Sequence, residues 1–262
     1  MKVSIIMAVF NYPGLTKALD SIPRRNDIEV LVVDDCSTDE TWKILENYYN
    51  EHSNDFGNFI VIRSSENYGL GHTKNIMFEM AQGEYIYQLD DDDWLYPDVF
   101  EQAMNELDGS DLVYVSPEVN DGRIFRVTPE SKFGYCAGYT KFIRRKFLGT
   151  NRTREDVWNE DLCFNNLLQD LPHTEKFTDL VPYHYNFPRK GSMYWNATHP
   201  KKLSIIMPVK DRIENTKKLL DKLKNQITKE DIEIIVVENG STEDMSFLND
   251  YENNYTTIIY SD

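Results

Sequence analysis

Two groups of acidic residues follow short apolar runs in the first half of the chain. Asp34 and Asp35 follow residues 28–33, and four consecutive aspartates at 90–93 follow residues 85–89. Carboxylate oxygens are hard ligands that suit Mg²⁺ or Mn²⁺, and such an ion often bridges to a substrate phosphate. A bound divalent ion would also relieve the mutual repulsion of the four aspartates. The alternative interpretation is a solvated acidic turn that begins the next helix.

The elements that position these residues follow from the spacing of apolar side chains. Nearly continuous apolar runs predict strands at 3–9, 28–34, 58–63 and 84–89, as expected for a parallel sheet covered on both faces. Helical spacing predicts helices at 14–22, 39–52 and 70–81, then a helix near 97–107, strands near 111–115 and 123–127, and a helix near 160–170. The alternation predicts an α/β fold, in which ligands bind beyond the carboxyl ends of the strands. Both acidic groups lie at such ends.

An internal repeat divides the chain. Residues 203–209 repeat residues 3–9, and residues 232–242 repeat residues 28–38, in the same order and at nearly the same separation. We therefore expect one domain at 1–200 and an incomplete βαβ copy of its first part at 201–262. Glu238 and Asn239 replace Asp34 and Asp35 in the second copy, so we do not expect that copy to catalyse by itself. Its unfinished sheet would leave an unpaired edge, which makes self-association a hypothesis.

Composition excludes several classes of function. The chain has 262 residues and a net charge of −16, with 44 Asp and Glu against 28 Lys and Arg, which argues against binding nucleic acid or an anionic membrane. We expect no transmembrane segment, because no apolar run approaches the roughly 18 residues that one needs. The chain leads directly into a strand, so we expect a cytoplasmic location. Three cysteines predict neither a disulfide framework nor a zinc site.

Five blocks of sequence together resemble the successive motifs of a known family. They lie at 3–11, 32–39 (Val-Val-Asp-Asp-Cys-Ser-Thr-Asp), 67–75 (Asn-x-Gly-x-Gly-x-Thr-Lys-Asn), 81–86 and 89–95 (Leu-Asp-Asp-Asp-Asp-Trp-Leu). In order and spacing they are similar to family 2 glycosyltransferases of the GT-A fold. The resemblance implies a Rossmann-like, mostly parallel sheet flanked by helices. Tandem domains of this kind occur in bacterial polysaccharide synthases.

The resemblance also implies which residues hold the nucleotide-sugar donor. They are Phe10, Asn11, Asp34, Asp35, Lys74, Asp90, Asp91, Arg189 and Lys190. Asp92 would ligate the metal directly, while Asp90 would bond the ribose or a metal-bound water. Asp93 would contact the sugar or support the metal ligands. Lys74 stands where the family usually has Arg, so its phosphate or sugar role competes with that of a surface lysine. His184 would be a metal ligand or phosphate contact, or a structural histidine.

A second acidic pair implies the catalytic step. Asp161 matches the position of the family's general base, with Glu160 beside it. In an inverting transfer, such a carboxylate takes the proton of the acceptor hydroxyl as that hydroxyl attacks the anomeric carbon. The alternative is an acidic pair that the helix dipole favours in a first turn, whatever its function.

These implications combine into one expected function. It is a glycosyltransferase, dependent on Mn²⁺ or Mg²⁺, that moves a sugar with inversion from a nucleotide-diphosphate donor, in particular a UDP-sugar, to a hydroxyl of a glycan or other acceptor. One alternative is a catalytically inactive module that binds a nucleotide sugar or a carbohydrate. A sugar-phosphate nucleotidyltransferase would instead need a glycine-rich basic loop after the first strand, where this chain has Phe10 and Asn11.

Overall fold

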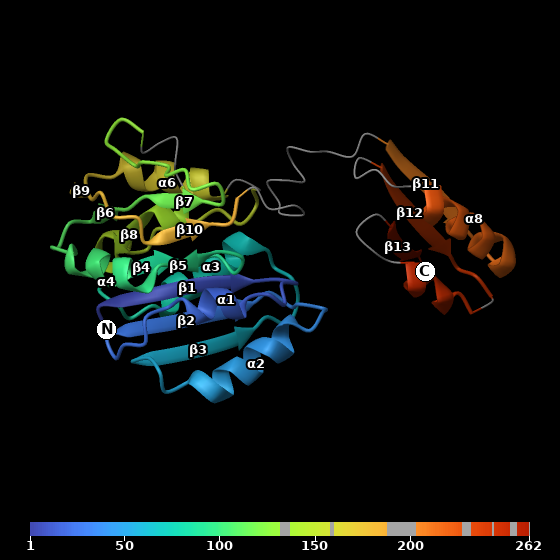
Figure 1. Cartoon of the computed structure of the whole chain (residues 1–262), viewed down its shortest axis with the longest axis horizontal. Helices are drawn as coiled ribbons and strands as arrows, with labels where there is room; N and C mark the ends of the chain where they lie inside the picture. The colour runs from blue at the N-terminus through green and yellow to red at the C-terminus, as the bar shows by residue number, and fades with distance from the viewer. Residues whose placement is uncertain are drawn as a thin grey trace. The chain divides into compact units, whose positions relative to one another are not determined.

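The chain folds into two compact units, Met1–Pro188 and Arg189–Asp262. The structure is a computed structural model that describes residues 1–131, 137–157, 160–187, 203–226, 232–242, 244–251 and 256–261 (Figure 1). The expected boundary after residue 200 lies outside these residues. Among the described helices, none has the length and apolar character needed to cross a membrane.

The first unit is built on a seven-stranded sheet of order β3-β2-β1-β4-β8-β6-β9. Its strands are β1 (Val3–Val9), β2 (Ile28–Asp34), β3 (Asn58–Arg63), β4 (Tyr85–Gln88), β6 (Leu112–Tyr114), β8 (Lys141–Arg144) and β9 (Glu175–Phe177). The first four strands run parallel, and β8 is antiparallel to both of its neighbours. This mostly parallel α/β sheet confirms the expected fold class.

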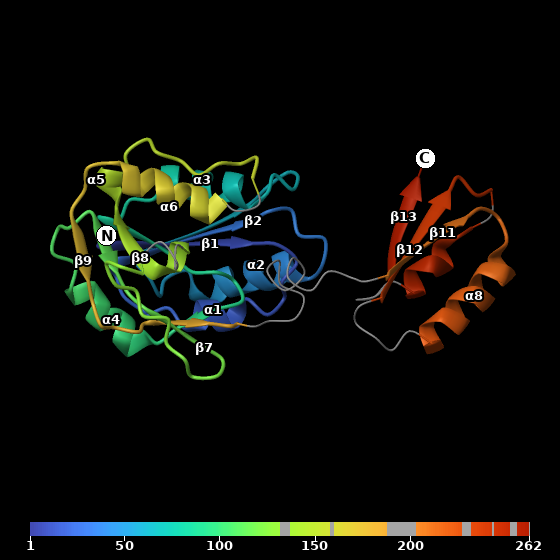
Figure 2. The ribbon, with the colours of Figure 1, turned by 90° about the horizontal axis from the view of Figure 1, so that it is seen from above.

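Helices cover both faces of this sheet, which explains the continuous apolar runs of its strands. Figure 2 shows one layer on each side of the sheet: α1 (Thr16–Asp20), α2 (Thr41–His52) and α4 (Pro97–Asn105) on one, and α3 (Leu70–Met80), α5 (Arg145–Leu148) and α6 (Glu160–Asp170) on the other. Successive strand side chains point to opposite faces. Ile5 and Met7 of β1 therefore pack in the core beneath α1, α2 and α4, while Ile6 packs in the core beneath α3, α5 and α6.

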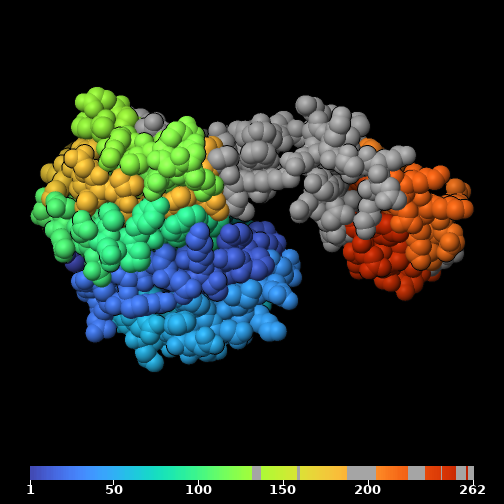
Figure 3. Space-filling view, viewed as in Figure 1, coloured from blue at the N-terminus to red at the C-terminus, as the bar shows by residue number. Residues whose placement is uncertain are grey.

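The segments after β4 form a second part of the unit. Figure 3 shows them (green to yellow) on the opposite side of the unit from the N-terminal segments (blue). They include the 3₁₀ turn η1 (Gly138–Thr140) and a small sheet of β5 (Trp94–Leu95), β10 (Tyr183–Tyr185) and β7 (Pro117–Val119). The strand expected at 123–127 is wrong. Because the chain reverses tightly at Gly122, whose φ is +79°, residues 123–127 make a single bridge, from Ile124 to Glu118.

The second unit contains a three-stranded parallel sheet of order β11-β12-β13. Its elements are β11 (Leu203–Val209), α8 (Ile213–Gln226), β12 (Ile232–Asn239), the 3₁₀ turn η2 (Ser246–Tyr251) and β13 (Thr256–Ser261). Met207, Val209 and Leu220 belong to its apolar core. Ile206 occupies the position of Ile6 in the repeat but is 66% exposed, whereas Ile6 is 1% exposed.

The two units share the hydrogen bonding and backbone conformation of one turn. In the first unit, Thr38 donates its backbone N–H to Asn11 Oδ1 (2.8 Å), and in the second unit Thr242 donates to Asp211 Oδ1 (2.6 Å). Both acceptor residues have a left-handed backbone, with φ of +48° and +40°. The repeat therefore extends from the sequence to the local backbone geometry.

Candidate active site

The acidic turn after β4 lies near a carboxyl group from a distant part of the chain, that of Asp161. Gln88, the last residue of β4, donates from Nε2 to Asp90 Oδ1 at 2.7 Å. Burial raises the pKa of Asp90 to about 7, and the negative charges of Asp161 and Asp92 act in the same direction. The positive charge of Lys74 opposes this rise. The fold has thus placed the first turn of α6 beside the carboxyl end of β4, although some 70 residues separate them.

Lys74 of α3 joins the acidic pair at the start of α6. Its Nζ lies 2.7 Å from Asp161 Oδ1 and 3.0 Å from Glu160 Oε1. The side chains of Lys74 and Glu160 are 3% and 7% exposed, whereas that of Asp161 is 33% exposed. Burial lowers the pKa of Lys74, but the combined attraction of the carboxylates raises it above its ordinary value. Of the expected catalytic pair, Asp161 is therefore the accessible member and Glu160 the buried one.

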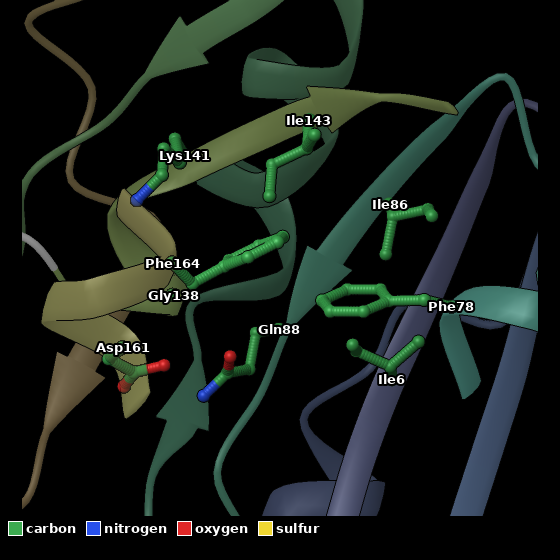
Figure 4. A pocket seen from close by; sticks show the side chains of 9 residues that line it. All are labelled: Ile6, Phe78, Ile86, Gln88, Gly138, Lys141, Ile143, Asp161 and Phe164. Carbon is green, nitrogen blue, oxygen red and sulfur yellow. The ribbon is translucent and has the colours of Figure 1, made fainter. Parts of the chain in front are cut away.

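A small cavity adjoins Asp161. Figure 4 shows the Asp161 carboxylate and the Gln88 amide on the same side of this cavity. The cavity volume is about 10 Å³, which is room for about one water molecule. Its other lining residues are Ile6, Phe78, Ile86, Gly138, Lys141, Ile143 and Phe164. The cavity is therefore too small to hold a sugar ring.

Gly138 allows the Gln88 side chain to reach Asp90. A Cβ atom added at Gly138 would overlap the side-chain carbonyl oxygen of Gln88. The side chain that bonds Asp90 therefore packs directly against Gly138.

Asp93 has a different environment from the other aspartates of the turn. It is 1% exposed and accepts hydrogen bonds from the Tyr183 hydroxyl and, at 2.8 Å, from the Asn186 backbone N–H. Asn186 Nδ2 also donates to the backbone oxygen of Asp92 at 3.2 Å. Asp93 therefore fastens the acidic turn to β10. This role of Tyr183 and Asn186 could not be predicted from the sequence, because neither is close to the turn along the chain.

The turns after β1 and β2 hold each other in place. Asn11 donates its backbone N–H to Ser37 Oγ at 2.9 Å, and Asp34 Oδ2 accepts the Ser37 backbone N–H at 3.1 Å. Asp34 is fully buried, and Arg63 Nε lies 3.4 Å from the same oxygen. In this structure, Asn11 and Asp34 support the turn at which the nucleoside is expected to bind.

Asp35 fixes the loop that begins α3. Its two carboxylate oxygens accept the backbone N–H groups of Tyr68 (2.9 Å) and Gly69 (2.7 Å). Gly69 has φ of +90°, a conformation that glycine adopts without strain. The side chains of Phe10 and Tyr68 remain exposed near these turns, at 45% and 42%. Tyr68 is not among the donor-site residues predicted from the sequence, although it lies inside the block at 67–75.

His184 has protein partners on both ring nitrogens. Nδ1 lies 2.9 Å from the Tyr96 hydroxyl, and Nε2 lies 3.0 Å from Asn120 Oδ1. Its ring stacks on Trp94 with a centroid separation of 3.8 Å, and burial lowers its pKa. We therefore leave His184 out of the metal set proposed below. Arg189 and Lys190 lie outside the described residues, so their expected role stays a prediction.

The acidic turn has the chemistry of a divalent-cation site that a substrate completes. Within the described part of the chain, no group of three or more His, Cys, Asp or Glu side chains is arranged to hold a metal ion by itself. Mg²⁺, however, is commonly bound by one or two carboxylates together with substrate phosphates and water. Asp90 and Asp92 lie close enough for the negative charge of Asp92 to raise the pKa of Asp90, and they fit such a partial set.

Comparison with known proteins decides the family. The profile described as "Glycosyl transferase family 2" matches residues 4–167 and 204–260, which together make up most of the chain. The chain belongs to glycosyl transferase family 2. The match includes all the described candidate residues of the first unit except His184, and it extends independently over the second unit.

Curated members of the family include relatives with about 30% identity. The chain is 31% identical over 170 residues to the poly(ribitol-phosphate) beta-N-acetylglucosaminyltransferase TarS of Staphylococcus aureus, which covers 58% of this chain and 29% of TarS. It is 29% identical over 241 residues to the cholesterol galactosyltransferase of Borreliella burgdorferi, covering 78% of this chain and 65% of that protein. The chain thus spans less than two thirds of the length of these relatives.

Solved structures of glycosyltransferases share the fold. S. aureus TarS 1–349 in complex with UDP-GlcNAc matches with a TM-score of 0.63 and 26% identity, over 73% of this chain and 60% of that one. A mannosyltransferase of Pyrobaculum calidifontis matches with a TM-score of 0.60 and 19% identity, over 87% of this chain and 64% of that one. The second likeness shows the fold alone.

Proposed function

We propose that the chain is a metal-dependent, inverting glycosyltransferase that moves a sugar from a UDP-sugar or a related donor to a hydroxyl of a glycan or other acceptor. The observation that carries the proposal is the Asp161 carboxylate. It is one-third exposed, it is held on one oxygen by Lys74, and it lies close enough to Asp90 to raise the pKa of that group. These features support Asp161 as the proton acceptor beside the acidic turn.

Each carboxylate has a proposed task. Asp161 takes the proton of the acceptor hydroxyl while that oxygen forms the new glycosidic bond and the nucleoside diphosphate departs. Asp92, with Asp90, would hold Mn²⁺ or Mg²⁺. When bound, such an ion stabilises the negative charge on the departing diphosphate. A base and a leaving group on opposite sides of the anomeric carbon lead to inversion.

The donor class is supported by the relatives and by the first unit's turns. The N-acetylglucosaminyltransferase TarS has been solved with UDP-GlcNAc, and other relatives are named as glucosyl- and galactosyltransferases. Phe10 and Tyr68 offer exposed aromatic rings beside the turns that Asn11 and Asp35 hold. Such rings suit stacking on a nucleobase.

The test combines a screen of donors with one substitution. The chain is incubated with UDP- and GDP-sugars and Mn²⁺, and release of the nucleoside diphosphate is measured with and without candidate acceptors. Because general-base help contributes about 10²–10⁴-fold, Asp161→Asn should lower kcat by that factor and leave the donor Kd unchanged. Asp156→Asn is the matched control, since Asp156 is an exposed carboxylate in the same stretch, paired with Arg154.

The binding-module alternative predicts a different result. A module that only binds would show donor binding in a thermal-shift assay but no metal-dependent turnover with any donor or acceptor. Unchanged turnover in Asp161→Asn, alongside an active wild type, would instead remove Asp161 from the role of base.

A further inference from the structure

We propose that Lys74 is a positioning residue for the base Asp161, and that it does not contact the diphosphate or sugar of the donor. The inference rests on the proposed function, since it assigns a role in the same reaction. It replaces the donor-binding role that the position of Lys74 in the sequence implies.

The contacts of Lys74 are directed at α6. Its ammonium group, which has three donors, bonds Asp161 Oδ1 at 2.7 Å and Glu160 Oε1 at 3.0 Å. Lys74 lies in the middle of α3, and both of its partners lie in the first turn of α6. The lysine therefore ties two helices on the same face of the sheet to each other at the point where the base is placed.

The burial of the cluster separates its members into supports and a reacting group. Lys74 and Glu160 are almost fully buried, while Asp161 retains an exposed third of its side chain. A buried charge is retained only where partners compensate it. Glu160 is thus the buried partner of the Lys74 ammonium group, and the ammonium group orients Asp161 through its hydrogen bond to Oδ1. Among the described residues none bonds the second carboxylate oxygen, which would accept the hydroxyl proton.

The surroundings of Lys74 make it a poor phosphate ligand. Its side chain is 3% exposed, and its ammonium group already bonds two carboxylates. The negative charges of Asp161, Asp90 and Glu160 all act on this one ammonium group. A diphosphate oxygen at the same nitrogen would add a further negative charge to that group. The cluster therefore suits orientation of a carboxylate better than capture of an anion.

The experiment measures donor affinity and turnover separately in Lys74→Met. Misplacing a reacting group by about 1 Å can cost about 10²-fold, so we expect kcat to fall by about that factor while the donor Kd remains that of the wild type. Lys74→Arg keeps a cation that can bond both carboxylates, and it should recover part of the lost kcat. In an Asp161→Asn background, Lys74→Met should cause no further loss of kcat, because the two residues act as one unit.

Circular dichroism establishes that each variant is folded. If Lys74→Met does not fold, Glu160→Gln replaces it: the ammonium keeps Asp161 but loses its charged inner partner, so we expect a smaller loss of kcat with an unchanged Kd. A raised donor Kd with kcat retained, or a further loss of kcat in the Asp161→Asn background, would overturn the positioning role. Absence of turnover in the wild type would instead refute the proposed function.

Discussion

At the scale of single residues, adjacent aspartates of the acidic turn have different partners and therefore different tasks. Asp90 accepts a hydrogen bond from Gln88, and the negative charges of Asp92 and Asp161 act on its carboxyl group. Asp93 is buried against Tyr183 and Asn186. The proposed metal-binding carboxylates and a structural carboxylate thus follow one another in a single run of sequence.

Gly138 should be needed for the placement of Asp90. The added Cβ of Gly138→Ala overlaps the Gln88 amide, so Gln88 must withdraw from Asp90. A hydrogen bond to a charged group contributes about 1.5–3 kcal/mol, so we expect kcat/KM to fall by about 10- to 100-fold. Steady-state kinetics test this, with Gln88→Met as the comparison. Gln88→Met should show a similar loss, and wild-type kinetics for Gly138→Ala would contradict the account.

The sequence predicted which residue types gather at the site, but not which of them face a substrate. The positions of Asp90 and Asp92 followed from an apolar run ending in carboxylates. By contrast, the bonds of Asp35 to the Tyr68 and Gly69 amides, and the burial of Asp34, depend on how loops 30 residues apart meet. No spacing rule within either block contains that information.

At the scale of elements, β10 stabilises the acidic turn from outside the main sheet. β10 pairs with β5, which follows the turn directly, and with β7. Tyr183 of β10 donates to Asp93 and also lies, through its hydroxyl, 3.3 Å from the Asp90 backbone nitrogen. One strand therefore contacts the turn at two of its four aspartates.

Removing the Tyr183 hydroxyl should loosen this connection. Tyr183→Phe leaves a buried carboxyl oxygen of Asp93 and the Asp90 N–H without this partner, which costs about 1–3 kcal/mol of unfolding free energy. Urea denaturation measures the change. Tyr185→Phe provides a control on the same strand, because Tyr185 is less buried and its side chain lies outside this pair of contacts. Equal stability of wild type and Tyr183→Phe would show that β10 does not support the turn.

The strands and helices of the first half were predictable because each has its own local signal. Strands β1, β2 and β3 occupy the residues that their apolar runs predict. Strands β5, β7 and β10 are two or three residues long, and they exist because distant segments pair with one another. Such short pairings leave no periodicity to detect.

At the scale of the whole molecule, the repeat was evident in the sequence and extends to the geometry of a turn. The second unit keeps that turn but has Glu238 and Asn239 at the positions of the first unit's aspartates. Ile206 is exposed where its counterpart Ile6 is covered, which supports the hypothesis that this unit associates with another surface. Self-association stays a prediction that sedimentation equilibrium of the full chain would test.

The proposed function requires that the acidic turn of the first unit holds a divalent ion together with a donor diphosphate. Titration calorimetry of UDP into the full chain, with and without Mn²⁺, tests it most directly. We predict that Mn²⁺ tightens UDP binding in the wild type and in Asp161→Asn by tenfold or more, about 1.4 kcal/mol, and that Asp92→Asn abolishes the effect. UDP binding that is equally tight with and without Mn²⁺, in the wild type and in Asp92→Asn, would contradict the claim.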